Sequence, residues 1–135
     1  MKAQKMDTSS VTNMNHMFDG CDIIQFVPLY DTRNVTTMSY MFNYCYMITS
    51  ENFPPFDTSN VTDMSDMFYA CYSMTKAPWL NTSSVLSTNS MFGECYGLME
   101  VPAYDLSNVT DLNSMFYQCE GLKELPDFDV SSATD

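Results

Sequence analysis

The chain has 135 residues and a formal net charge of −12 at pH 7, from 17 acidic and 5 basic side chains. So acidic a surface repels phosphate groups, which argues against nucleic acid as a partner and leaves cationic partners open. The sequence has no apolar run long enough to insert into a membrane, and its start, MKAQKMDTSS, lacks the apolar segment of an export signal. If the protein is exported, we expect that signal to lie outside this chain.

The chain is built from one repeated unit. An acid or its amide opens each unit, and a cysteine recurs near the middle. The opening residues are Asp7, Asp31, Asp57, Asn81, Asp105 and Asp129, and the cysteines are Cys21, Cys45, Cys71, Cys95 and Cys119. The opening residues are 24 residues apart, except for one step of 26 that reflects two extra residues in ITSENFPPF. This period predicts a single repeat domain over residues 1–135, and the incomplete units at both ends predict a fragment of a longer chain.

The first predicted element of each unit is a short strand that begins at a proline. The strands are PLYDTR, PPFDTS, PWLNTS, PAYDLS and PDFDVS. In the second of them, Phe56 and Thr58 alternate with Pro55 and Asp57, so one pair faces the core and the other faces outward. Stacked units place such strands side by side, which predicts a parallel sheet.

The acid that follows each strand has two interpretations. Stacked carboxylates at Asp7, Asp31, Asp57, Asp105 and Asp129 could hold calcium, but the glycine-rich turns of calcium-binding nonapeptide repeats are missing. Alternatively, each carboxylate accepts backbone N–H bonds in an Asx-turn. We expect the Asx-turn and no cofactor, with calcium left open.

A helix of about ten residues is predicted after each turn. Val61, Met64, Met67, Phe68 and Cys71 fall on one helical stripe. A good N-cap residue precedes every stripe, namely Ser10, Asn34, Asn60, Ser84 or Asn108. Asn34, Asn60 and Asn108, together with Asn81, also match glycosylation acceptors, which we interpret as by-products of the repeat because the first three are engaged as caps.

The methionine and cysteine columns could bind Cu(I), because thioether and thiolate are soft ligands. They are also the adaptable residues that fill protein cores. The one-sided stripe favours the core, so we expect a row of inward, reduced thiols and no metal. His16 is the only histidine and lies off the stripe, and no nucleophile or phosphate-binding loop accompanies it, so we expect no enzyme.

These motifs resemble one known family. DTSNVTDMSDMF at residues 57–68 and FYQCEGL at residues 116–122 resemble the BspA-like leucine-rich-repeat surface proteins, especially the branch with such repeats in mycoplasma lipoproteins. The resemblance covers nearly the whole chain and implies a curved strand–helix solenoid on cell-surface, secreted or phage tail proteins, where it serves adhesion or recognition. It implies no catalytic residues. The chain departs from the pattern at Thr88 and at the inserted SEN.

The predicted fold is therefore an α/β solenoid, leucine-rich-repeat-like, with about five 24-residue strand–helix rungs and a parallel sheet on one face. The residue after each proline varies most, and with Lys5 this column and the neighbouring acids form an outer face centred on Trp79. The predicted partner-binding residues are Leu29, Asp31, Arg33, Pro55, Asp57, Trp79, Asn81, Ala103, Asp105 and Asp127.

We expect this face to bind a host or cell-surface protein or glycan, in a protein that is extracellular, at the cell surface or on a virion. The alternative is a structural spacer or assembly element with no ligand of its own. Open ends of a repeat stack expose its core, so we also expect possible end-to-end self-association.

Overall fold

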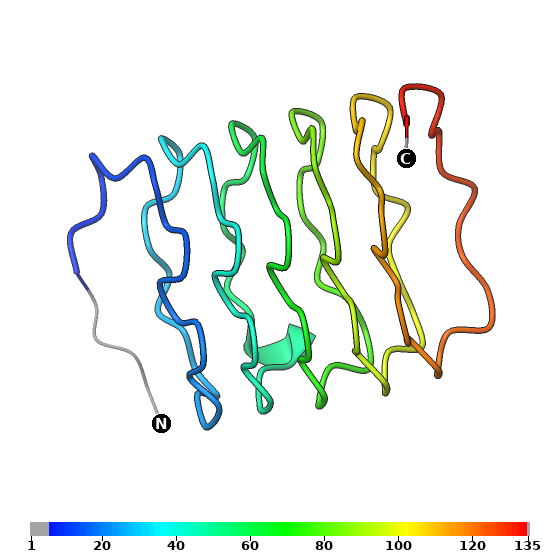
Figure 1. The fold of residues 1–135 in the computed structure, drawn as a ribbon. Coiled ribbons are helices and arrows are strands. Elements are labelled where there is room, and N and C mark those ends of the chain that lie inside the picture. The colour runs from blue at the N-terminus through cyan, green and yellow to red at the C-terminus, as the bar shows by residue number, and fades with distance from the viewer. Residues whose placement is uncertain (1–5, 135) are drawn as a thin grey trace.

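The computed structural model describes residues 6–134, so Lys5 lies outside the described residues. Successive repeats form coils that stand side by side from the N-terminal end (blue) to the C-terminal end (red) (Figure 1). The only helix within residues 6–134 is the short 3-10 helix η1, Ser50–Asn52. Isolated parallel β-bridges join neighbouring coils, for example Thr37 with Asp63 and Asp63 with Ser87, and no longer strand forms in this range.

The prediction of an α/β solenoid with a parallel sheet is therefore wrong, and so is the leucine-rich-repeat-like assignment. Each coil instead has two arms of irregular backbone. We call the first the turn arm, which comprises residues 11–21, 35–45, 61–71, 85–95 and 109–119. We call the second the return arm, which comprises residues 22–32, 46–58, 72–82, 96–106 and 120–130.

The turn arms form in place of the predicted helices because alternate backbone N–H groups donate to carbonyls of the next coil and not to carbonyls of their own. The N–H groups of Met67 and Cys71 each close a turn onto the carbonyl three residues earlier, at 3.2 Å. Those of Asp66 and Phe68 donate to carbonyls of the next coil at 2.8 and 2.9 Å. An α-helix needs every N–H to reach the carbonyl four residues earlier, so this pattern excludes it.

Backbone conformation enforces the same outcome. Asp66 and Ala70 have φ of 55° and 59°, which lies in the left-handed region that an α-helix does not contain. The two equivalent positions are left-handed in every described turn arm, at His16, Gly20, Tyr40, Tyr44, Asp66, Ala70, Ser90, Glu94, Ser114 and Gln118. Positive φ at the third residue of a four-residue turn is the geometry of a type II turn, so each turn arm is a run of overlapping turns.

The return arms replace the predicted strands. Neighbouring return arms are joined beside the acids mainly by side chains: the hydroxyl groups of Thr32, Thr58 and Thr82 donate to carbonyls of the following coil at 2.7 to 2.9 Å. Backbone bonds between return arms are concentrated near Lys76 and Glu100. A parallel sheet needs a continuous backbone ladder, and the return arms lack it.

The predicted inward residues are nevertheless buried. Val61, Met64, Met67, Phe68 and Cys71 all have 0% exposure. One phenylalanine from each turn arm forms a stack through the coils, with ring centroids 5.4 to 5.9 Å apart, made of Phe18, Phe42, Phe68, Phe92 and Phe116. Burial of these apolar side chains supplies the main driving force for stacking the coils.

No helix within residues 6–134 has the length and apolar character that crossing a membrane requires.

Candidate functional site

The acid column forms the turn that connects a return arm to the next turn arm. Asp57 Oδ1 accepts the backbone N–H of Ser59 at 3.0 Å and its hydroxyl at 2.6 Å. Asn81 makes the same two bonds to Ser83, at 3.1 and 2.7 Å. The backbone bond recurs at Asp7, Asp31, Asp105 and Asp129, so the predicted Asx-turn is confirmed.

These carboxyl groups are ionised over a wide pH range. The Ser59 hydroxyl holds the pKa of Asp57 below its usual value, and Ser107 and Ser131 do the same for Asp105 and Asp129. A row of negative charge therefore runs along this edge of the stack. No group of three or more His, Cys, Asp or Glu residues within residues 6–134 is arranged to hold a metal ion.

Arg33 lies in the same row and pairs with Asp31. Its guanidinium contacts Asp31 through Nη2–Oδ2 at 2.6 Å and through Nε at 3.0 and 3.1 Å. This bidentate contact lowers the pKa of Asp31. The Arg33 charge also contributes to the lowered pKa of Asp57 on the next coil, after the bonds from Ser59, but one guanidinium does not balance the three acids of this part of the row.

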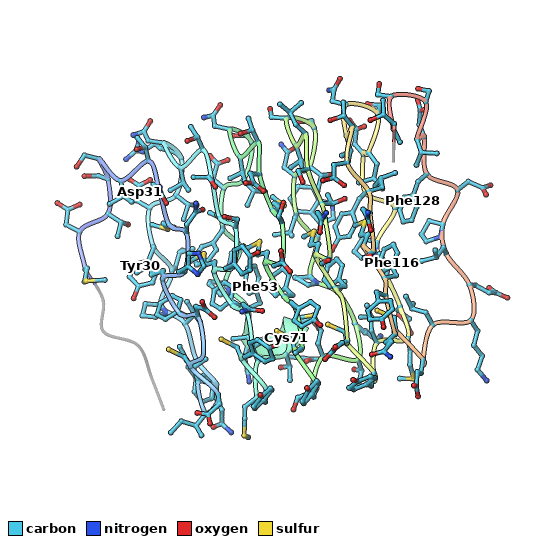
Figure 2. All side chains as sticks on the ribbon, in the orientation of Figure 1. Tyr30, Asp31, Phe53, Cys71, Phe116 and Phe128 are labelled. Atoms are coloured by element: carbon cyan, nitrogen blue, oxygen red, sulfur yellow. The ribbon has the colours of Figure 1, made fainter. Side chains whose placement is uncertain are left out.

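The structure brings five predicted partner-binding residues together around an open hollow of about 620 Å³. Tyr30 and Asp31 mark its place toward the N-terminal end of the stack (Figure 2). The five residues are Leu29, Asp31, Arg33, Pro55 and Asp57, and the hollow is also lined by Met6, Asp7, Thr8, Tyr30 and Thr32. The other predicted residues, Trp79, Asn81, Ala103, Asp105 and Asp127, lie outside it on later coils.

Trp79 follows its proline on the coil after Pro55 and is 74% exposed, which is the greatest exposure among the exposed large apolar side chains of the described residues. Ala103 and Asp127 are exposed at the equivalent positions of the next two coils. The predicted outward orientation of this column is therefore confirmed. Its assignment to the outer face of a sheet is wrong, because the return arms form no sheet.

The cysteine column is a row of inward thiols, as the sequence predicts. Each thiol from Cys45 onward donates to a phenylalanine carbonyl of the preceding coil, for example from Cys71 to Phe42 at 3.3 Å. All five cysteines are free. Burial raises the pKa of Cys45 and Cys95 to about 12, which keeps these thiols protonated and makes them poor ligands for a soft metal.

The residues assigned as N-caps bond between coils instead. The amide nitrogen of Asn60 donates to the carbonyl of Arg33 at 2.8 Å, and Asn34 and Asn108 donate in the same way to the preceding coil. Ser84 uses its hydroxyl at 2.7 Å. The N-cap interpretation is wrong because there is no helix to cap, although these side chains are engaged.

A row of stacked tyrosines at the start of the return arms escaped the sequence interpretation. The rings of Tyr46, Tyr72 and Tyr96 stack along three coils, with centroids 4.7 and 5.3 Å apart. The Tyr69 hydroxyl beside them donates to Glu94 at 2.6 Å. The signal was present in the sequence, because a tyrosine follows the cysteine in each of these three units.

His16 is exposed, as the sequence predicts, and it is engaged at the surface. Its ring stacks on Tyr40 with centroids 4.6 Å apart, and Nδ1 lies 2.7 Å from a carboxylate oxygen of Asp19. Both contacts are local to the first two turn arms.

The fold defines a repeat protein made of stacked coils with a turn arm and a return arm. The chain belongs to the family described as Mycoplasma protein of unknown function, DUF285, which matches residues 1–100 and 77–135. This match fits the mycoplasma-type repeat and not the BspA-like leucine-rich-repeat assignment, and it is consistent with a location at the cell surface. No curated protein and no solved structure matches the chain.

Proposed function

We propose that the chain is a non-enzymatic recognition module of an extracellular, cell-surface or virion protein. Its binding site is the hollow lined by Leu29, Asp31, Arg33, Pro55 and Asp57. The observation that carries the proposal is that variable residues from neighbouring coils gather there around a common open space. Framework residues face the core, so this surface can change without loss of the fold.

The charges of the hollow favour a protein partner with basic side chains. Asp7, Asp31 and Asp57 contribute three acids, and Arg33 is occupied by Asp31. Leu29 adds an apolar side chain that is 58% exposed. A partner Lys or Arg would contact the carboxylates while its aliphatic stem packs on the apolar side chains.

The test is binding to host cells and to a glycan array by the wild type, the double variant Asp31→Asn/Asp57→Asn and the control Leu86→Ala. Asparagine keeps the turn, because Asn81 makes the same bonds as Asp57. Leu86 is 50% exposed and lies on a turn arm, away from the hollow. We expect the double variant to bind cells at least about tenfold more weakly, since that corresponds to the loss of roughly 1.4 kcal/mol, and Leu86→Ala to bind as the wild type does.

Trp79→Ala measures how far the site extends along the stack. Weaker binding would place the next coil within the site. Unchanged cell binding by the double variant would contradict the acidic hollow as the site. Binding to a neutral glycan without dependence on salt would replace the basic protein partner with a sugar, and no binding to any cell or glycan would leave the role of spacer or assembly element.

A further inference from the structure

The C-terminal end of the stack carries a row of free backbone donors. In the turn arm of residues 85–95, alternate N–H groups donate to carbonyls of the last turn arm, residues 109–119, at 2.6 to 3.0 Å. The equivalent N–H groups of residues 109–119 have no acceptor among residues 6–134. They belong to Leu112, Ser114, Phe116 and Gln118.

The N-terminal end carries the complementary row of acceptors. Carbonyls of residues 35–45 accept N–H bonds from residues 11–21 at 2.8 to 3.0 Å. The equivalent carbonyls of residues 11–21 accept no bond from the described residues. They belong to Asn13, Asn15, Met17 and Asp19. Inside the stack, N–H groups at the four donor positions of the repeat bond to carbonyls at the four acceptor positions of the next coil. The four donors of the C-terminal end therefore match the four acceptors of the N-terminal end.

The apolar side chains at the two ends match as well. A hollow of about 320 Å³ at the C-terminal end is lined by Leu112, Met115, Phe116 and Phe128, two of which Figure 2 marks at that end. At the other end, Phe18 begins the phenylalanine stack that Phe116 ends. Placing one end on the other would continue that stack and cover Leu112, Met115 and Phe116.

We propose that copies of this chain associate head to tail, with the C-terminal end of one copy on the N-terminal end of the next. The two surfaces differ, so the contact is heterologous and each added copy leaves a free end. A second copy is the occupant because it supplies carbonyls at the required positions and phenylalanine in the required column.

Residues 129–134 would control this association. They occupy the repeat positions of residues 7–12, and Phe128 occupies that of Met6, so an incoming copy has to displace residues 128–134. Between coils they are held by Thr134, whose N–H and hydroxyl donate to the Thr110 carbonyl at 3.0 and 3.1 Å. Thr12 of the incoming copy is the equivalent residue, and its N–H would take the place of the Thr134 N–H.

Charge opposes the contact. Asp19 and Asp22 lie on the first coil, and Asp111 and Glu120 lie on the last. Added salt screens such repulsion between exposed groups, so we expect association to strengthen with sodium chloride, in contrast to a contact between opposite charges.

The first experiment is light scattering of the full chain over a range of protein and salt concentrations. The wild type should show a mass that rises continuously with concentration and with salt. Leu112→Glu, at the C-terminal end, should remain a monomer, whereas the matched variant Leu86→Glu on the side of the stack should behave as the wild type does. Thr134→Pro removes the N–H that holds the displaced segment, so it should associate at lower concentration.

The second experiment mixes two variants that are each blocked at one end. Met17→Glu blocks the N-terminal end and Leu112→Glu blocks the C-terminal end, so together they should form a 1:1 dimer that does not grow. Cys21 reports the contact directly: it is half-buried, and in the assembly its thiol would donate to the Phe116 carbonyl of the preceding copy. Its alkylation should therefore slow as the mass rises.

A wild type that stays monomeric at millimolar concentration and high salt would overturn the proposal, and would leave a further coil of a longer chain as the occupant of these ends. Association that Leu112→Glu does not reduce, or that leaves the alkylation rate of Cys21 unchanged, would overturn it as well. None of these variants lies in the acidic hollow, so a change in their association does not by itself test the proposed recognition of a basic partner.

Discussion

The two arms of each coil are held to their neighbours by different means. In the turn arm, alternate backbone N–H groups bond to the next coil, as from Phe68 to the Met91 carbonyl at 2.9 Å. In the return arm, the contacts beside the acids use side chains, as from the Thr58 hydroxyl to the Asn81 carbonyl at 2.8 Å. A backbone ladder fixes the number of residues between bonds, whereas side-chain contacts fix only the positions that carry those side chains.

The extra two residues of one coil show the consequence. They lie in a return arm, where the chain forms η1, Ser50–Asn52. The turn arms on either side keep their register, because Phe42 stacks on Phe68 at 5.7 Å, close to the 5.5 Å between Phe68 and Phe92. The variable column that includes Trp79 also lies on the return arms. The insertion and the variable column therefore both lie on the arm that carries most of the candidate site.

Insertions in the two arms test this difference most severely. Gly-Ser inserted after Ser65 should prevent folding, because it moves Met67, Phe68 and Cys71 off their inward positions. Each buried apolar side chain contributes about 1.5–3 kcal/mol, against a total stability of about 5–15 kcal/mol for a domain.

The matched insertion after Lys76 should leave a folded protein, less stable by about 1 kcal/mol for each bond lost to Glu100. Thermal unfolding followed by circular dichroism measures both variants. A folded protein with the insertion after Ser65 would show that the ladder does not fix the register.

Truncation of one aromatic residue in each arm gives the next largest effect. Phe68→Ala removes a ring with 0% exposure and should cost about 3–5 kcal/mol of unfolding free energy. Trp79→Ala removes a ring that is 74% exposed and should change stability by no more than about 0.5 kcal/mol. Urea titrations give both values, and a large loss for Trp79→Ala would mean that this ring stabilises the stack.

Acid should weaken the turns between the two arms. The pKa of Asp57 is lowered in the folded state, so its stabilisation is present above the ordinary value of 3.8 and is lost as the pH falls through the lowered value. Asp57→Asn should lose this contribution while keeping the turn, as Asn81 does. Melting temperatures from pH 7 to pH 2 should therefore fall less steeply for the variant than for the wild type, and equal slopes would contradict the assignment.

The rates of thiol alkylation report which cysteines are buried in the core. Of these predictions, this one involves the smallest change in stability. At pH 8 and low protein concentration, Cys21 should be alkylated first because it is only half-buried. Cys45 and Cys95 should react only as the protein unfolds, because burial raises the pKa of each to about 12 and denies access to the reagent. Mass spectrometry of peptides over time would reveal the order, and early loss of the Cys71 thiol would show that the coils open locally.

The sequence by itself determined the repeat and the inside and outside of each coil. Residues such as Met64 and Cys71 recur with the repeat, and burial of apolar side chains is enough to place them in the core. The Asx-turn at Asp57 was also predictable, because an aspartate side chain bonds locally to the backbone two residues later. Five residues of the hollow were predicted to face outward, because side chains alternate between inward and outward positions along this part of each repeat.

Only the tertiary structure decided the backbone conformation and the grouping of the site. Four-residue turns place side chains inward at spacings close to those of a helix, so the stripe from Val61 to Cys71 did not distinguish the two. Left-handed φ usually signals glycine, yet among these positions only Gly20 is one, and Ala70 and Tyr40 carry no such signal. The next coil selects the turns, because it supplies the carbonyls that their free N–H groups need. A single repeat cannot show where those bonds go, nor that Leu29 and Pro55 meet in one hollow.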